Sequence, residues 1–114
     1  MSPRSARDWR LYADDIIDSC GKIRRVVSGM TREEFLADDV RRDAVIRNIE
    51  IIGEAARHLP EELRAAAQQI PWRLVMDMRN LLAHAYFGVS PLVVWDTART
   101  QVEELEKAVR AMLA

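Results

Sequence analysis

The sequence predicts an all-α fold: a single domain, residues 1–114, built as an up-and-down bundle of four to five helices. Glycine and proline are scarce, at four each. Apolar residues recur at steps of three and four along nearly the whole chain, and no stretch alternates with a period of two. The length suffices for one continuous core but not for a catalytic domain with a separate substrate domain.

The first helix is predicted over about residues 6–27. Its apolar face comprises Trp9, Tyr12, Ile16, Cys20, Ile23 and Val27. Gly29 follows it and can take the left-handed conformation that closes a helix. Thr31 and Glu34 then have the spacing of a capping box, which predicts a short helical turn carrying Phe35 and Leu36.

A second long helix is predicted from Asp38 or Asp39 to Leu59, where Pro60 stops it. Its apolar face comprises Val45, Ile49, Ile52, Ala56 and Leu59. Residues 61–69 favour a short helix. The next helix begins at Pro71-Trp72, because proline is tolerated in a first turn, and Gly88 can end it.

The last helix is predicted to follow Ser90-Pro91. Its apolar residues alternate in steps of three and four: Trp95, Ala98, Val102, Leu105, Val109 and Met112. A free-standing coiled coil is the alternative. The bundle is favoured because the run is short and the earlier helices also carry single apolar faces that need a partner.

Composition and charge exclude several classes of protein. The 17 basic and 18 acidic residues give a net charge of −1, which argues against nonspecific coating of nucleic acid but permits a nuclease. The start lacks the apolar region of a signal peptide, and no segment has the roughly 18 apolar residues of a bilayer span. We therefore expect a cytoplasmic protein without a membrane partner. The single Cys20 is expected in the core.

The helix predicted over residues 72–87 has an apolar face and a polar face. At about 100° per residue, one arc of about 120° holds Leu74, Val75, Met78, Leu81, Leu82 and Ala85. Off that arc lie the polar residues Arg79, Asn80, His84 and Tyr86. Among these polar residues fall Met76, Ala83 and Phe87. This second apolar stripe indicates a subunit contact and hence a homodimer.

The polar residues suit phosphodiester chemistry. A histidine such as His84 can act as general base or acid near neutral pH, and an arginine such as Arg79 can hold a phosphate. RNA supplies its own nucleophile, the 2′-hydroxyl, so the reaction needs no metal. Asn80 can orient the imidazole. From these residues alone, a solvated helix face with a dimer contact is the favoured explanation, and His58 is interpreted as structural.

The string Arg79-Asn80-Leu81-Leu82-Ala83-His84-Ala85-Tyr86 matches the RxxxxHxY signature of HEPN domains. Its continuation Phe87-Gly88-Val89 resembles the HepT (DUF86) branch of that superfamily. Residues 43–55, 70–73 and 94–96 resemble other parts of the HepT pattern in the expected order. Ala85 departs from it, since relatives often have an acidic residue there.

The resemblance implies a homodimeric helical bundle and a metal-independent endoribonuclease without a cofactor. Arg79 and His84 would be catalytic, with Asn80 in support, at a composite cleft that binds RNA. It also implies a type VII-like toxin–antitoxin pair, in which a minimal nucleotidyltransferase antitoxin silences the toxin, in some systems by transferring AMP to the tyrosine that corresponds to Tyr86.

Other charged residues are further candidates for lining the cleft or binding RNA. Arg47 and Glu54 lie seven residues apart on one helix face and match charged positions of the family, so they are candidates for lining the cleft; an ion-pair network with Glu50 is the alternative. The pairs Arg24-Arg25 and Arg41-Arg42 suggest an RNA path or simply a solvated surface. The rival functions are a noncatalytic dimer that binds a nucleotidyltransferase and a nucleotide or nucleic acid, and a purely structural dimer.

Overall fold

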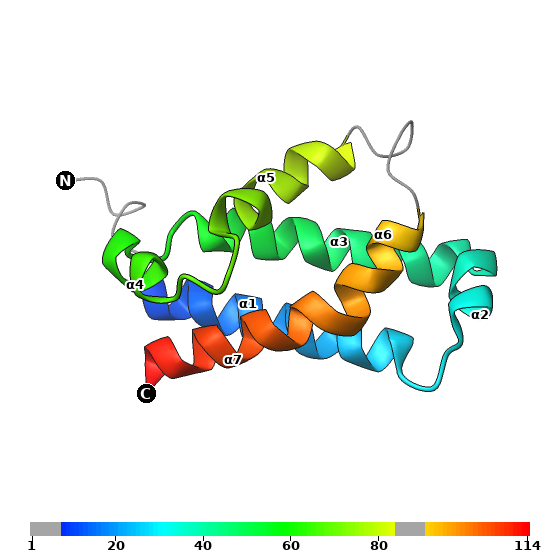
Figure 1. Cartoon of the computed structure of the whole chain (residues 1–114), viewed down its shortest axis with the longest axis horizontal. Helices are drawn as coiled ribbons and strands as arrows, with labels where there is room; N and C mark the ends of the chain where they lie inside the picture. Colours follow the sequence, from blue (N-terminus) through cyan, green and yellow to red (C-terminus); the bar gives the residue numbers. More distant parts are fainter. Residues whose placement is uncertain (1–7, 84–90) are drawn as a thin grey trace.

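The computed structural model describes residues 8–83 and 91–114, with side chains for all of these except residues 79–83. Every regular element in this part of the chain is helical, which confirms the predicted all-α fold. Four long helical runs alternate in direction along the molecule, as the up-and-down prediction requires (Figure 1). None of the helices in the described ranges combines the length and hydrophobicity needed to cross a bilayer.

Helix α1 (Trp9–Val27) begins three residues later than predicted because Asp8 is its N-cap. The Asp8 side chain accepts a hydrogen bond from the backbone N–H of Arg10 at 3.0 Å, which satisfies one of the free donors of the first turn. Beyond the C-terminus, Gly29 has a φ of 75°, the left-handed conformation expected there.

The predicted capping box is present at α2 (Arg32–Ala37). The Glu34 N–H donates to Thr31 Oγ1 at 3.1 Å, and the Thr31 N–H donates to Glu34 Oε1 at 2.9 Å. Helix α3 (Asp39–Ala56) ends three residues before the predicted Leu59. The N–H groups of His58 and Leu59 each bond to the carbonyl three residues earlier, so the chain tightens and turns there, which still leaves Leu59 buried.

The second half of the chain contains two long helical runs. Helix α4 (Glu61–Ala66) is short, and α5 (Trp72–Ala83) follows Pro71 as predicted. Helix α6 (Pro91–Asp96), the π-helix η3 (Thr97–Gln101) and α7 (Val102–Leu113) form one continuous run. The predicted end at Gly88 and the cap at Ser90 lie outside the described residues.

The π-helix was not predicted. Thr97 and Thr100 each donate a side-chain hydrogen bond to the carbonyl oxygen four residues earlier, that of Val93 at 2.8 Å and that of Asp96 at 2.7 Å. Such back-bonding by threonine competes with the backbone ladder and distorts a helix. The apolar periodicity of this run survives the distortion, so the sequence pattern gave no sign of it.

The core forms where α1 packs against both α3 and α7, and α3 packs against α5. The predicted apolar faces of the first, second and last long helices are buried, with Trp9, Tyr12 and Met112 half-buried at their margins. Glu106 is a buried carboxylate on α7, bound by Arg24 of α1 at 3.0 Å and by Arg110 at 3.0 Å. This pairing ties α1 to α7 beside the apolar core.

We predict that Phe35→Ala lowers the free energy of unfolding by about 3–5 kcal/mol, measured by urea denaturation. Phe35 is fully buried, and its ring centroid lies 5.2 Å from that of Trp95, so truncation leaves a cavity between α2 and α6. Val40→Ala is the control, because Val40 is 75% exposed. It should change stability by no more than about 0.5 kcal/mol. Equal losses in the two variants would contradict the assigned core.

Candidate functional site

Helix α5 carries the first half of the motif. Arg79 and Asn80 lie on its regular backbone, which continues to Ala83. Their side chains are outside the described residues, as are His84 and Tyr86 altogether. The predicted catalytic pair therefore stays a prediction, and the structure describes the platform on which its arginine is mounted.

The N-terminal end of α5 is fixed by a buried tryptophan. Trp72 is 9% exposed, and its indole Nε1 donates to the backbone carbonyl of Ala67 at 3.1 Å. The N–H of Val75 bonds to the carbonyl of Pro71 at 3.0 Å, which completes the first turn. The loop after α4 and the start of α5 are thus joined before the motif begins.

The predicted apolar arc of α5 is only partly covered. Val75 and Met78 are half-buried against the core, but Leu74 is 42% exposed, contrary to the prediction. The reason is a pocket of about 140 Å³ beside this face. Leu74 lines the pocket instead of filling it. Leu81, Leu82 and Ala85 lie outside the described side chains.

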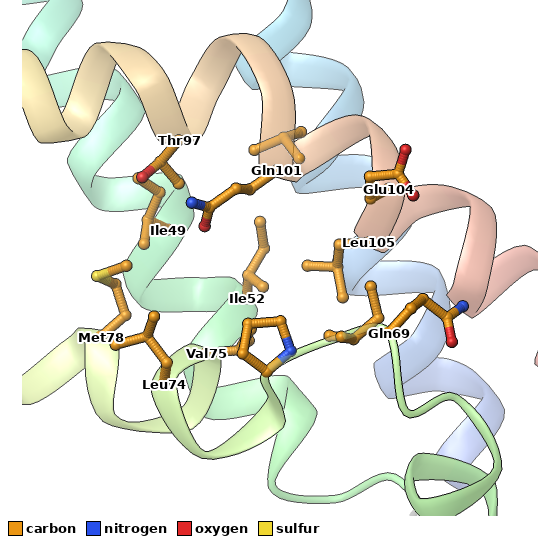
Figure 2. Close-up of a pocket in the computed structure, with 13 residues that line it drawn as sticks. Ile49, Ile52, Gln69, Leu74, Val75, Met78, Thr97, Gln101, Glu104 and Leu105 are labelled. Atoms are coloured by element: carbon orange, nitrogen blue, oxygen red, sulfur yellow. The ribbon is translucent and has the colours of Figure 1, made fainter.

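This apolar pocket lies between α5, α3 and the η3–α7 run. Figure 2 shows Leu74, Val75 and Met78 on one wall and Ile49 and Ile52 on another. The polar residues that line it are Gln69, Thr97, Gln101 and Glu104. Aliphatic and thioether walls suit a compact apolar group and do not suit a phosphate, which needs charged or N–H donors.

Met76, one member of the second apolar stripe, already has contacts within the chain, and the predicted subunit contact stays a prediction. Met76 is half-buried against the core. Arg57 Nη2 donates to its backbone carbonyl oxygen at 3.3 Å, and Arg64 Nη1 donates to its Sδ atom at 3.3 Å. This part of the predicted subunit contact is therefore used within the chain. The other two members of the stripe, Ala83 and Phe87, lie outside the described side chains.

The secondary candidates on α3 lie together on its outer face. Arg47, Glu50 and Glu54 line a second pocket, of about 470 Å³, with Tyr12 and Asp15 of α1. Three carboxylates and one guanidinium make this pocket acidic, which disfavours an RNA phosphate there.

The ion pairs at this face differ from those considered from the sequence. Glu54 Oε2 lies 4.0 Å from Nε of Arg57, a pair that the sequence did not indicate. His58, the residue after Arg57, stacks on Tyr12 with ring centroids 4.1 Å apart. This contact agrees with the interpretation of His58 as a structural residue. Glu54 thus belongs to a charged chain that leads from α3 through Arg57 to α5.

Three arginines of the suggested RNA path have partners within the chain. Arg24 binds Glu106. Arg41 binds Asp38 and the carbonyl of Val26, and Arg42 donates to the carbonyl of Leu36. These contacts join separate elements, so the side chains contribute to packing whatever their role towards RNA.

Comparison with known proteins decides the family. Residues 16–112 match the family "Ribonuclease HepT-like". The chain belongs to the HepT-like family. A protein of Caldanaerobacter subterraneus subsp. tengcongensis named "Putative RNase TTE0752" is 38% identical over 104 residues, covering 91% of this chain and 93% of its own. A Thermococcus cleftensis protein named "Probable ribonuclease HepT" is 38% identical over 100 residues, covering 88% and 91%. No solved structure gives a significant match.

The HepT-like match spans most of α1 and everything up to α7, so it includes both the motif and the helices that carry it. It supports a ribonuclease type of role for this chain. Sequence reasoning missed Arg57 and Arg64, which contact the motif helix. No signal in the sequence marks them, because each bonds to a residue that is distant along the chain.

Other sites offer little chemistry. Among the described residues, no three His, Cys, Asp or Glu side chains are grouped so as to hold a metal ion. Cys20 is buried in the core, as predicted. Burial raises the pKa of its thiol from 9.0 to about 12, with the negative charge of Glu106 adding to the effect. A thiol with that pKa is no nucleophile at neutral pH.

We predict that the folded HepT-like protein does not react with Ellman's reagent at pH 8 and titrates one thiol after denaturation. The unfolded thiol ionises near its ordinary pKa of 9.0, whereas the folded thiol keeps its proton to about 12. The unfolded state therefore binds fewer protons in that window, and stability should fall as the pH rises through it. Cys20→Ser should remove this part of the pH dependence; rapid labelling of the folded wild type would contradict the buried thiol.

Proposed function

We propose that this HepT-like protein is a metal-independent endoribonuclease in which Arg79 and His84 cleave RNA at a composite cleft of a homodimer. One observation carries the proposal: the chain retains the RxxxxH spacing within a similarity of nearly full length to proteins named as RNases. The regular backbone of α5 supports it, because a stable helix gives Arg79 and Asn80 a rigid mounting.

In the proposed reaction, His84 takes the proton of a 2′-hydroxyl as the O2′ atom attacks the adjacent phosphorus. The bond to the 5′-oxygen breaks, and that oxygen receives a proton from the second copy of His84 in the dimer. The products are a 2′,3′-cyclic phosphate and a 5′-hydroxyl. Arg79 stabilises the negative charge that grows on the nonbridging oxygens, and Asn80 orients the imidazole or the substrate.

The α3 residues have a secondary place in this proposal. Arg47 lines the acidic pocket, so its proposed place is at the margin of the cleft and not against a phosphate within that pocket. Glu54, which lies 4.0 Å from Arg57, is kept as the second candidate at the margin of the cleft.

The activity of the ribonuclease is proposed to be regulated by an antitoxin, in a cytoplasmic toxin–antitoxin pair of the type VII-like kind. A minimal nucleotidyltransferase would transfer AMP from ATP to Tyr86: the phenolic oxygen attacks the α-phosphorus, and pyrophosphate leaves. The added phosphate would place a negative charge two residues after His84, where it competes with RNA for the positive charge of Arg79. Both the partner and the modification come from the family resemblance.

We predict that the purified dimer cleaves host total RNA in the presence of EDTA and leaves cyclic phosphate ends. Arg79→Ala should lower the rate about 10²–10³-fold by removing a group that stabilises the transition state. His84→Ala should lower it about 10²–10⁴-fold by removing the general base. The readout is gel analysis of end-labelled fragments.

The matched control for this experiment is Arg32→Ala, which also removes one positive charge but lies on α2 with its side chain 57% exposed. It should cleave like the wild type. If folded, unmodified wild type cut none of the host RNA, the endoribonuclease proposal would be rejected in favour of the noncatalytic binding dimer.

Tyr86→Phe should retain cleavage but escape silencing by the nucleotidyltransferase and ATP. Intact mass spectrometry should show one AMP added per wild-type chain and none on the variant. Tyr12→Phe is the control, since Tyr12 is the other of the two tyrosines in the chain. Equal silencing of wild type and Tyr86→Phe would sink the proposed modification while leaving the nuclease chemistry intact.

A further inference from the structure

Two arginines from different elements converge on one residue of the motif helix. Arg57 is the C-cap of α3, and its guanidinium bonds to the carbonyl oxygen of Met76 at 3.3 Å. Arg64 belongs to α4 and bonds to the thioether sulfur of the same residue at 3.3 Å. We call these two contacts the Met76 clamp. They attach the end of α3 and the short α4 to the middle of α5.

The clamp uses both kinds of acceptor that Met76 offers. A helix carbonyl has two lone pairs, so it can accept from Arg57 while still serving the ladder of the helix. The sulfur is a weak acceptor, but here it meets a charged donor. One contact holds the backbone of α5 and the other holds its side chain, so together they restrict both sliding and rotation of this helix.

Arg64 makes a second hydrogen bond, which fixes the orientation of the guanidinium that contacts Met76. Its Nε atom donates to the carbonyl oxygen of Leu59 at 3.3 Å, in the turn that follows α3. Helix α4 buries none of its side chains. Arg64 therefore connects α4 and the preceding turn to α5, although α4 itself adds no buried side chain to the core.

The position of Met76 in α5 gives the clamp its relevance to the motif. Arg79 follows Met76 by three residues, and residues three apart on an α-helix are neighbours on its surface. The apolar pocket leaves Leu74 exposed on another face of α5, so packing alone does not enclose this helix. The contacts at Met76 therefore add to the packing of α5 on α3 in fixing the direction in which Arg79 leaves the helix.

Glu54 extends the same chain of contacts. Its carboxylate lies 4.0 Å from Nε of Arg57, whose other nitrogen Nη2 reaches Met76. The Arg57 and Glu54 side chains are 43% and 52% exposed, so water screens the pair and its share of the overall stability is small. The role of Glu54 in this pair is to orient the Arg57 guanidinium.

We propose that Arg57 and Arg64 are positioning residues of the nuclease site, which hold α5 in the rotation that directs Arg79 to the RNA phosphate, with Glu54 orienting Arg57. This inference rests on the proposed ribonuclease function. Displacement of a catalytic group by about 1 Å can lower the rate of the chemical step about 10²-fold, whereas the other contacts that bind the RNA are left in place. The clamp should therefore act on kcat and leave KM nearly unchanged.

The test compares Arg57→Gln, Arg64→Gln and Met76→Leu in RNA cleavage, with Arg32→Gln as the control that removes the same charge. Arg57→Gln and Arg64→Gln should each lower kcat about 10-fold or more with KM within about twofold. Met76→Leu keeps the volume but removes the sulfur. It should reproduce the effect of Arg64→Gln, and the double variant Arg64→Gln/Met76→Leu should be no worse than either single variant. Arg57→Lys should restore part of the Arg57→Gln loss.

Three results would overturn the clamp. A raised KM with unchanged kcat would make the arginines direct RNA contacts. A loss equal to that of Arg32→Gln would make them general charge contributors. Additive losses in the Arg64→Gln/Met76→Leu pair would mean that the two residues act separately.

A second measurement separates this proposal from the nuclease proposal. Hydrogen exchange without RNA should be faster in the amides of α5 in Arg57→Gln and Arg64→Gln, and unchanged in α1. If the wild type cleaves no RNA, the positioning role falls together with the proposed function. Unchanged exchange in α5, in a wild type that does cleave, would refute the clamp alone.

Discussion

The packing of α5 on α3 is the contact on which the arrangement of the molecule depends. Helix α3 is covered by α1 and α5, and α1 is covered in turn by α7. Beside this contact, between α5, α3 and the η3–α7 run, lies the apolar pocket, where Leu74 is left open to solvent. The motif helix is thus supported strongly from one direction and weakly from another, so the seam with α3 and the contacts at Met76 determine where its arginine is presented.

The periodic parts of this fold could be predicted because their information is local. Steps of three and four placed the buried faces of α1, α3 and α7, and the spacing of Thr31 and Glu34 identified a capping box that the structure contains. The residues at which the helices begin and end were harder to predict from the sequence. Asp8 moves the start of α1, and the tight turn at His58 and Leu59 ends α3 before Pro60, because hydrogen bonds to single groups decide both.

The candidate site rests on its sequence motif and stays a prediction, and the surroundings of that motif could not be predicted from the sequence. Arg79 and His84 are found by their spacing, but the exposure of Leu74 depends on how far α5 stands from η3 and α7, which no pattern within α5 encodes. Glu54 likewise pairs with Arg57 three residues on, although Arg47 on the same helix face offered an equally plausible partner. Tertiary geometry selects one of several locally acceptable arrangements, so these details had to come from the structure.

The π-helix η3 is a place where members of this family can gain or lose one residue. A π-turn holds one residue more than an α-turn, so η3 is equivalent to a single residue inserted into a continuous helix. Deleting one residue within Thr97–Gln101 would restore regular α-helix and leave α7 facing α1. The same deletion elsewhere in the run would rotate everything beyond it by about 100° and turn Leu105 and Val109 away from the core. Single-residue gaps among relatives are therefore expected to gather at this segment.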